Sequence, residues 1–263
     1  MQRNENYEFQ IDNFIHQQKK EFPMQLTGSL AKARKYVESH TKLMEDTSSR
    51  KKIKPGPCLT ISRQCGIDTV KIGNALVQKF NKLKIDDLGD WAVFDKNLID
   101  KVLNDHDLPE RLNKFMTEEK MSTMNSMLNE LLKVHPPILK LLHKTSSTIF
   151  KLAEMGNVII VGRGGNLVTA GLKNTFHIRL VAPLNRRIEE VQRIFDISKK
   201  DAEKMIAHED KARAEYFQNH FHKDIDDPLL YHAVINIGLY DFDMLINTIS
   251  EMVTIRFPKF FKV

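Results

Sequence analysis

One stretch, residues 57–73, constrains what this chain can fold into more than any other. Residues 58–62 are apolar enough for a short buried strand, and residues 63–68 then form a loop that contains one glycine. Beyond the loop, apolar side chains recur every fourth residue, which is the period of one helix face, at Ile72, Leu76 and Phe80. A strand, a tight loop and a helix N-terminus together present unpaired N–H groups and the positive end of the helix dipole. The stretch therefore predicts an anion-binding site.

The loop departs from the common phosphate-binding motif G-x-x-x-x-G-K-[ST]. Gly66 is retained, Thr69 stands at the lysine position, and Lys71 is the nearest cation. Asp68 adds a negative charge where phosphates would lie. Two interpretations remain open: a phosphate-binding loop, or an ordinary strand-to-helix turn in which Asp68 or Thr69 caps the helix.

Composition narrows the class of protein. The 263 residues are 41% hydrophobic, enough for the core of a large domain, and no apolar run approaches the roughly 20 residues of a membrane span. The polar N-terminus is unlike a signal peptide, and two cysteines, Cys58 and Cys65, suit a reduced cytoplasmic protein better than a disulfide framework. The net charge of +6 favours anionic partners. We expect a cytoplasmic protein without a membrane partner.

Short apolar runs alternate with helical patterns along the chain. The continuous run over residues 158–161 is typical of a strand covered on both faces, as in a parallel sheet. We expect strands at residues 58–63, 91–94, 158–161, 176–182 and 233–237. We expect helices at residues 25–46, 69–82, 96–104, 110–155 with a break at 135–137, 167–172, 184–195, 198–219 and 241–256. This pattern predicts an α/β fold with a three-layer, doubly wound, five-stranded parallel sheet.

The expected domain organisation has two parts. Residues 1–56 read as a helical extension with a basic linker, and residues 57–263 as the α/β domain. Within that domain, residues 110–155 form a helical insertion and residues 198–222 a lid. The basic stretch at residues 50–54 fits either a solvated hinge or contact with nucleic acid or acidic lipid. The extension also offers a route to a homodimer through its helices.

Several charged residues fall at the ends of the predicted strands. Ligands in parallel α/β folds bind beyond the carboxyl ends of the strands. Arg63, Asp95 and Arg163 lie at or just after such ends. We therefore expect a single cleft that collects these three side chains together with Gly66.

Six motifs follow one another over about residues 57–255. They are ISRQCG at 61–66, VFDKNLI at 93–99, VIIVGRGGN at 158–166, LVAP at 180–183, DKARAEY at 210–216 and DDPLLY at 226–231. Their order and spacing resemble the cytidylate kinase-like family, a branch of the nucleoside-monophosphate kinases with the P-loop fold. The resemblance implies phosphoryl transfer from ATP to a nucleotide such as CMP, with Mg²⁺.

The resemblance also implies roles for individual residues. The loop would hold the donor phosphates through Arg63, Gly66, Thr69, Val70 and Lys71. The acceptor would be bound by Asp95, Gly162, Gly164 and Asp210. Catalytic charge stabilisation would come from Arg163 at the acceptor phosphate, from Arg187 in the helix before the lid, and from Arg213 on the lid. Arginines suit this task because they keep their charge and bind phosphate oxygens in pairs.

Departures from the family pattern support an alternative. The family's glycine-serine-glycine-glycine run is replaced by residues 66–69, GIDT, and Gly164 stands where cytidylate kinases carry an aspartate. The alternative is a catalytically degenerate protein of the same fold that binds a nucleotide or phosphate and regulates. Nucleic-acid binding, suggested by the net charge, is a third and less favoured hypothesis. His220 and His222 are two residues apart and do not face one another on a helix, so we expect no metal site.

Overall fold

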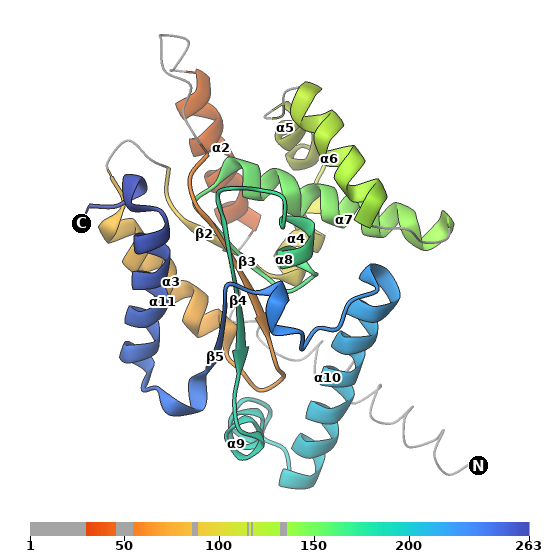
Figure 1. Cartoon of the computed structure of the whole chain (residues 1–263), viewed down its shortest axis with the longest axis vertical. Coiled ribbons are helices and arrows are strands. Elements are labelled where there is room, and N and C mark those ends of the chain that lie inside the picture. Colours follow the sequence, from red (N-terminus) through yellow and green to blue (C-terminus); the bar gives the residue numbers. More distant parts are fainter. Residues whose placement is uncertain are drawn as a thin grey trace.

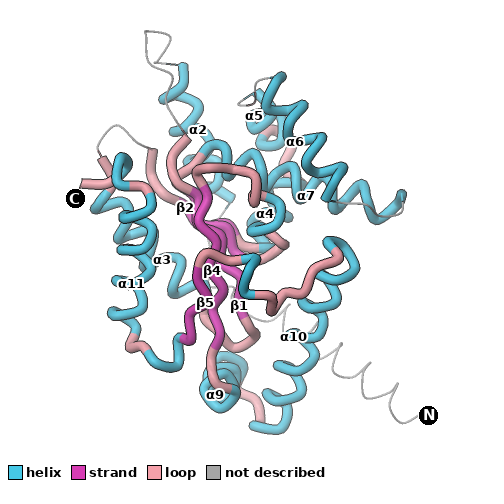
Figure 2. Tube along the Cα trace, in the orientation of Figure 1, coloured by secondary structure: helices cyan, strands magenta, loops and turns pink. Residues whose placement is uncertain are grey.

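The computed structural model describes residues 30–45, 55–85, 89–114, 116, 118–131 and 136–262. Five strands form one sheet in the order β2-β3-β1-β4-β5, and every pairing is parallel (Figures 1 and 2). Their bounds are Cys58–Arg63 for β1, Ala92–Phe94 for β2, Val158–Val161 for β3, Thr175–Val181 for β4 and Ala233–Asn236 for β5. The predicted α/β class with a five-stranded parallel sheet is confirmed.

Helices cover both faces of the sheet (Figure 1). One face is covered by α3 (Thr69–Leu83) and α11 (Phe242–Arg256). The other face is covered by α2 (Leu30–Glu45), α4 (Lys96–Leu103), α5 (Leu108–Lys114), α6 (Glu118–Leu131), α7 (Pro136–Met155) and α8 (Gly165–Val168). At the carboxyl edge lie α9 (Leu184–Phe195) and α10 (Lys199–Phe221). Short 3-10 turns are η2 (Pro228–Leu230), η3 (Ile237–Leu239) and η4 (Pro258–Phe260).

Alternation along β1 divides the core into two layers. Leu59 and Ile61 point toward the layer of α3 and α11, where they join a cluster with Phe80. Cys58 points the other way and joins the cluster built by α4 and α7. Both sets are buried because successive side chains of a strand face opposite sides of the sheet. This explains why the central strands read as continuous apolar runs.

The register of the central strands brings two arginines to one edge. Ile61 of β1 lies opposite Val161 of β3, so the residues that follow both strands emerge side by side. On the other side of β1, Arg63 lies opposite Leu180 of β4. Parallel strands end at the same edge, which is where such folds bind ligands.

Some helix predictions are wrong in detail. The short helix predicted at residues 167–172 begins earlier, as α8 at Gly165, because Gly164 adopts a φ of 66° and starts it as the N-cap. The helix predicted to begin at residue 110 begins at Leu108, as α5, because proline is tolerated in a first helical turn. The predicted helical run at 110–155 is three helices, α5, α6 and α7. The basic stretch at 50–54 and the extension before residue 30 lie outside the described residues.

Helix α2 extends the core beyond the edge of the sheet. Ala33, Tyr36 and Val37 are buried, and the Tyr36 hydroxyl donates a hydrogen bond to the Gly156 carbonyl oxygen at 2.5 Å. Ala33 and Val37 therefore lie on a buried face of α2. None of the described helices combines the length and apolar character needed to cross a membrane. The division at residue 56 and a homodimer through this extension stay predictions.

Truncation of Phe80 tests the layer under α3 and α11. Its side chain is fully buried, and its ring centroid lies 4.4 Å from that of Trp91 and 5.7 Å from that of Phe261. We expect Phe80→Ala to lower the free energy of unfolding by about 3–5 kcal/mol, because it removes apolar contacts and leaves a cavity. Leu239→Ala, at a side chain that is 76% exposed, should change it by less than about 0.5 kcal/mol. Chemical denaturation followed by far-UV circular dichroism measures both, and equal losses would contradict the assignment of the core.

Candidate functional site

Three arginines from separate elements line one cavity at the carboxyl edge of the sheet. Arg63 ends β1, Arg163 follows β3, and Arg213 lies on α10. The cavity has a volume of about 260 Å³, and we call it the arginine cavity. Its other lining residues are Ser62, Lys96, Val161, Gly162, Glu209, Ala212, Tyr216, Phe217 and Ile225. The structure thus brings together three of the arginines that the sequence singled out.

Among the arginines of this cavity, Arg63 makes no direct ion pair within the described part of the chain, although the Asp95 and Glu209 carboxylates lie close enough to raise its pKa. Burial, and to a lesser extent the neighbouring Arg213 cation, lower the pKa of Arg63 to about 10. The guanidinium passes over Gly162, where a Cβ atom would lie 2.7 Å from Arg63 Nη1. A buried cation is costly unless a counter-charge compensates it. The arrangement therefore favours an anionic ligand in the cavity.

Arg163 is held in place by helix α4. Its Nη2 donates to both carboxylate oxygens of Asp100, at 3.1 and 2.9 Å. The backbone of Arg163 has a φ of 54°, in the left-handed region, which is strained for a residue with a side chain. Its Nε is buried and has no hydrogen-bond partner among the described residues. The pair with Asp100 fixes the direction of a strained arginine, while its Nε–H stays without a partner among the described residues.

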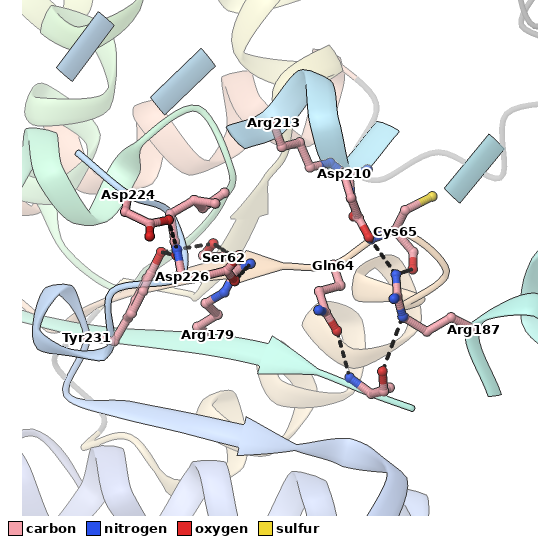
Figure 3. A network of polar contacts seen from close by, with 12 residues as sticks. Ser62, Gln64, Cys65, Arg179, Arg187, Asp210, Arg213, Asp224, Asp226 and Tyr231 are labelled. Atoms are coloured by element: carbon pink, nitrogen blue, oxygen red, sulfur yellow. Dashed lines mark hydrogen bonds and ion pairs between the residues drawn. The ribbon is translucent and has the colours of Figure 1, made fainter. Parts of the chain in front are cut away.

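Asp210 of α10 connects the loop after β1 with helix α9 (Figure 3). One carboxylate oxygen accepts from the Cys65 backbone N–H at 2.7 Å, and the other accepts from Arg187 Nη1 at 2.5 Å. Arg213 Nη1 lies 3.5 Å from Asp210 Oδ1. Arg187 also donates to the backbone oxygens of Ala182 and Cys65. Arg187 is therefore directed at the backbone of the loop, and it is absent from the lining of the arginine cavity.

The loop itself is closed by its own side chains. Asp68 caps α3 by accepting from the Lys71 N–H at 2.9 Å, so the capping interpretation is observed. Ile67 is buried in the core cluster with β1, and Thr69 is buried in the first turn of α3. Gly66 has a φ of 82°, and a Cβ there would lie 2.6 Å from the Arg187 carbonyl oxygen. In this conformation carboxylates occupy the N–H groups of residues 65 and 71, so nucleotide phosphates do not fit on them.

The expectation of a single cleft is wrong for Gly66, and Asp95 is also absent from the lining of the arginine cavity. Gly66, Lys71 and Arg187 line a second cavity of about 210 Å³, while Arg63 and Arg163 line the arginine cavity. Val70 and Lys71 line an open groove, where Lys71 Nζ lies 4.5 Å from the centroid of the Phe242 ring. The physical reason is that Asp210 and Arg187 fill the space beside the loop.

Two other predicted residues have observed structural contacts. Asp95 caps α4 by accepting from the Leu98 N–H at 2.8 Å. A Cβ on Gly164 would lie 2.5 Å from the Phe221 ring, so a glycine there lets α10 pack against the loop after β3. Acceptor binding by Asp95 and Gly164 stays a prediction.

A model of the cytidylate kinase-like family matches residues 58–239. The chain belongs to this family. The match includes all five strands and the helices from α3 to α10, so the arginine cavity lies within the part of the chain that the family defines. The resemblance expected from the six motifs is confirmed.

Two relatives are similar over part of their length. Cytidylate kinase of Methanocaldococcus jannaschii is 27% identical over 105 residues, which are 39% of this chain and 59% of that protein. Uronate isomerase of Corynebacterium glutamicum is 28% identical over 119 residues, which are 45% of this chain and 23% of that protein. The chain therefore spans less than two thirds of either relative. A solved structure of an uncharacterized protein from Eubacterium ventriosum shares the fold, with a TM-score of 0.56 at 18% identity over 75% of this chain and 97% of that one.

Sequence reasoning missed a polar network beside the arginine cavity of this cytidylate kinase-like protein. Arg179 is buried in β4 and donates to Ser62 Oγ at 2.8 Å and to Asp226 Oδ1 at 2.5 Å (Figure 3). The Tyr231 hydroxyl donates to the Ile225 carbonyl oxygen at 2.8 Å. A charged residue inside an apolar strand pattern was the available indication of this network. It fixes Ser62, which lines the cavity.

Sequence reasoning also missed Lys96, Glu209 and Tyr216 in the cavity wall. Lys96 directly follows Asp95, whereas Glu209 lies four positions before Arg213 and Tyr216 three positions after it. Residues three and four apart share a helix face, so the helical spacing around Arg213 could have indicated two of them.

Neutralising Asp226 tests the network. Its side chain is 65% exposed whereas that of Arg179 is 5% exposed, so the substitution removes the counter-charge of a buried cation. We expect Asp226→Asn to lower the free energy of unfolding by about 1–2 kcal/mol, a value reduced by the exposure of the carboxylate. Asp243→Asn makes the same charge change at an exposed position of α11 and should have little effect. Thermal denaturation compares the Tm of the two variants, and an equal shift in both would count against a structural role for the pair of Arg179 and Asp226.

Proposed function

We propose that this protein is a nucleoside-monophosphate kinase that transfers a phosphoryl group from ATP to an acceptor such as CMP. The observation that carries the proposal is the arginine cavity, where Arg63, Arg163 and Arg213 converge and Arg63 has no carboxylate paired with it among the described residues. Membership of the cytidylate kinase-like family supports this reaction class. The acceptor phosphate would occupy the arginine cavity.

The chemistry needs what the cavity offers. In phosphoryl transfer the protein mainly positions the reactants and spreads positive charge over the oxygens of the transferred group. Arg63 and Arg163 come from the rigid sheet edge, while Arg213 comes from α10. A helix that carries one of the cations can complete the site when both substrates are present.

Magnesium enters the proposal with the nucleotide. The described residues contain no group of three His, Cys, Asp or Glu side chains placed to hold a metal ion. Mg²⁺ would therefore be held mainly through the phosphates of ATP, and its contribution would be to neutralise phosphate charge. The residues of this chain supply the arginines around the acceptor.

A second candidate function is ligand binding without turnover. It is favoured by the closed loop, in which Asp68 and Asp210 occupy backbone N–H groups and Ile67 is buried. Such a protein would bind a nucleotide or another phosphate ester through the arginine cavity and act as a regulator. Turnover separates it from the first proposal.

The decisive experiment is turnover with ATP, Mg²⁺ and each of CMP, UMP, AMP and GMP in turn. We expect a nucleoside diphosphate from at least one acceptor, and we expect Arg63→Met to lower kcat/KM by a factor on the order of 10²–10³, as for loss of a charge-stabilising donor. Arg193→Met removes an arginine that is 64% exposed and paired with Glu190, and it should leave kcat/KM unchanged.

Three results are distinguishable. Diphosphate formation that depends on Arg63 supports the kinase. Binding of a monophosphate that Arg63→Met abolishes, without turnover on any acceptor, supports the second candidate. Absence of both binding and turnover rules out the arginine cavity as a nucleotide site.

The same variant separates a ligand-binding arginine from a structural one. Because Arg63 is a partly buried cation without a direct ion pair in the described structure, Arg63→Met should raise the free energy of unfolding of the free protein by about 1 kcal/mol. A structural arginine would instead show a loss. Denaturant titration in the absence of ligand measures the difference, with Arg193→Met as the control.

A further inference from the structure

The Asp210 carboxylate occupies a position that resembles the binding site of an anionic ligand, and we call this position the seat. Its carboxylate is surrounded by the Cys65 backbone N–H at 2.7 Å, Arg187 Nη1 at 2.5 Å and Arg213 Nη1 at 3.5 Å. A backbone N–H in a strand-to-helix loop and two guanidinium groups are also the donors that bind phosphate oxygens. Arg187, which is nine-tenths buried, makes this a built site rather than a surface contact.

We propose that Asp210 is an internal competitor of the anion that binds at this seat. In the free protein its carboxylate satisfies Cys65, Arg187 and Arg213, and a phosphate-type oxyanion displaces it on binding. The inference rests on the proposed function, because it takes the phosphates of a nucleotide as the competing anion. It explains how a loop that is closed in this structure can still receive a phosphate.

The surroundings of Asp210 fit an exchange of anions. The Asp210 side chain is 29% exposed, so an anion can approach it from solvent. A phosphate carries about −1.5 to −2 charges at neutral pH against −1 for the carboxylate, and it has three acceptor oxygens. Exchange therefore keeps the donors satisfied and gains attraction to two arginines, while the displaced carboxylate regains water.

Helix α10 is packed at both ends, which confines the exchange to its middle. Near its start, Ala202 and Ile206 pack with α9 and with Cys65. Near its end, Phe217 and Phe221 join the large core cluster. Asp210 lies between these anchors, so its side chain can move without unpacking the helix.

The experiment uses inorganic pyrophosphate, without Mg²⁺ or nucleoside, as the probe. We expect Asp210→Asn to bind pyrophosphate about tenfold more tightly than the wild-type protein in isothermal titration calorimetry, since the internal competitor has lost its charge. Glu203→Gln makes the same charge change on an exposed position of α10 and should bind as the wild type does. Asp210→Glu keeps a carboxylate and should not gain affinity. Equal or weaker binding by Asp210→Asn overturns the proposal.

A measurement on the wild-type protein keeps the test valid if Asp210→Asn does not fold. A structure of the wild-type chain with pyrophosphate should place a phosphate oxygen within hydrogen-bond distance of the Cys65 N–H and of Arg187, with Asp210 turned away. Pyrophosphate bound elsewhere, while Asp210 keeps its bond to Cys65, overturns the proposal. If Asp210→Asn binds pyrophosphate more tightly but the wild-type protein shows no nucleotide turnover, the result supports Asp210 as an internal competitor and contradicts the proposed kinase activity. If the wild-type protein turns over nucleotides but Asp210→Asn gains no affinity for pyrophosphate, only the proposal for Asp210 is contradicted.

Discussion

Backbone pairing of β1 on both of its edges is the constraint on which the site depends. The strand is hydrogen-bonded to β3 on one side and to β4 on the other, so the position of its last residues is fixed to the register of both neighbours. That register puts Arg63 beside the turn after β3, where Arg163 emerges, and puts Ser62 opposite Arg179. The placement of the arginines is therefore a consequence of main-chain geometry, which tolerates little adjustment.

Charge compensation then distinguishes the arginines of this edge from one another. Arg163, Arg179 and Arg187 each pair with one carboxylate, from Asp100, Asp226 and Asp210 respectively. Each of these pairs joins segments far apart in the chain, so it contributes to holding the fold together. Arg63 has no such pair in the described structure, which makes it the member whose charge is available to a ligand. An arginine at this edge is therefore structural when a carboxylate pairs with it, and it is available to a ligand when none does.

Much of this could be predicted from the sequence because it follows from local patterns. Apolar runs located the strands, and the strand-end rule brought Arg63 and Arg163 together. The bond between Asp210 and the Cys65 N–H could not be predicted, since it joins residues 145 positions apart and depends on where α10 lies over the loop. The same contact explains why Gly66 does not open into the arginine cavity.

The burial of Ile67 has a consequence for how the loop behaves in time. Its side chain is 8% exposed and belongs to the apolar cluster under β1, so the loop shares the stability of the central sheet. Glycine-rich loops usually open in local fluctuations, whereas a segment anchored in the core opens only with a large cooperative unit. Slow amide hydrogen exchange at Cys65, whose N–H donates to Asp210, is the physical signature of such anchoring. The strand-to-helix loop of this chain is therefore anchored in the core and does not open on its own.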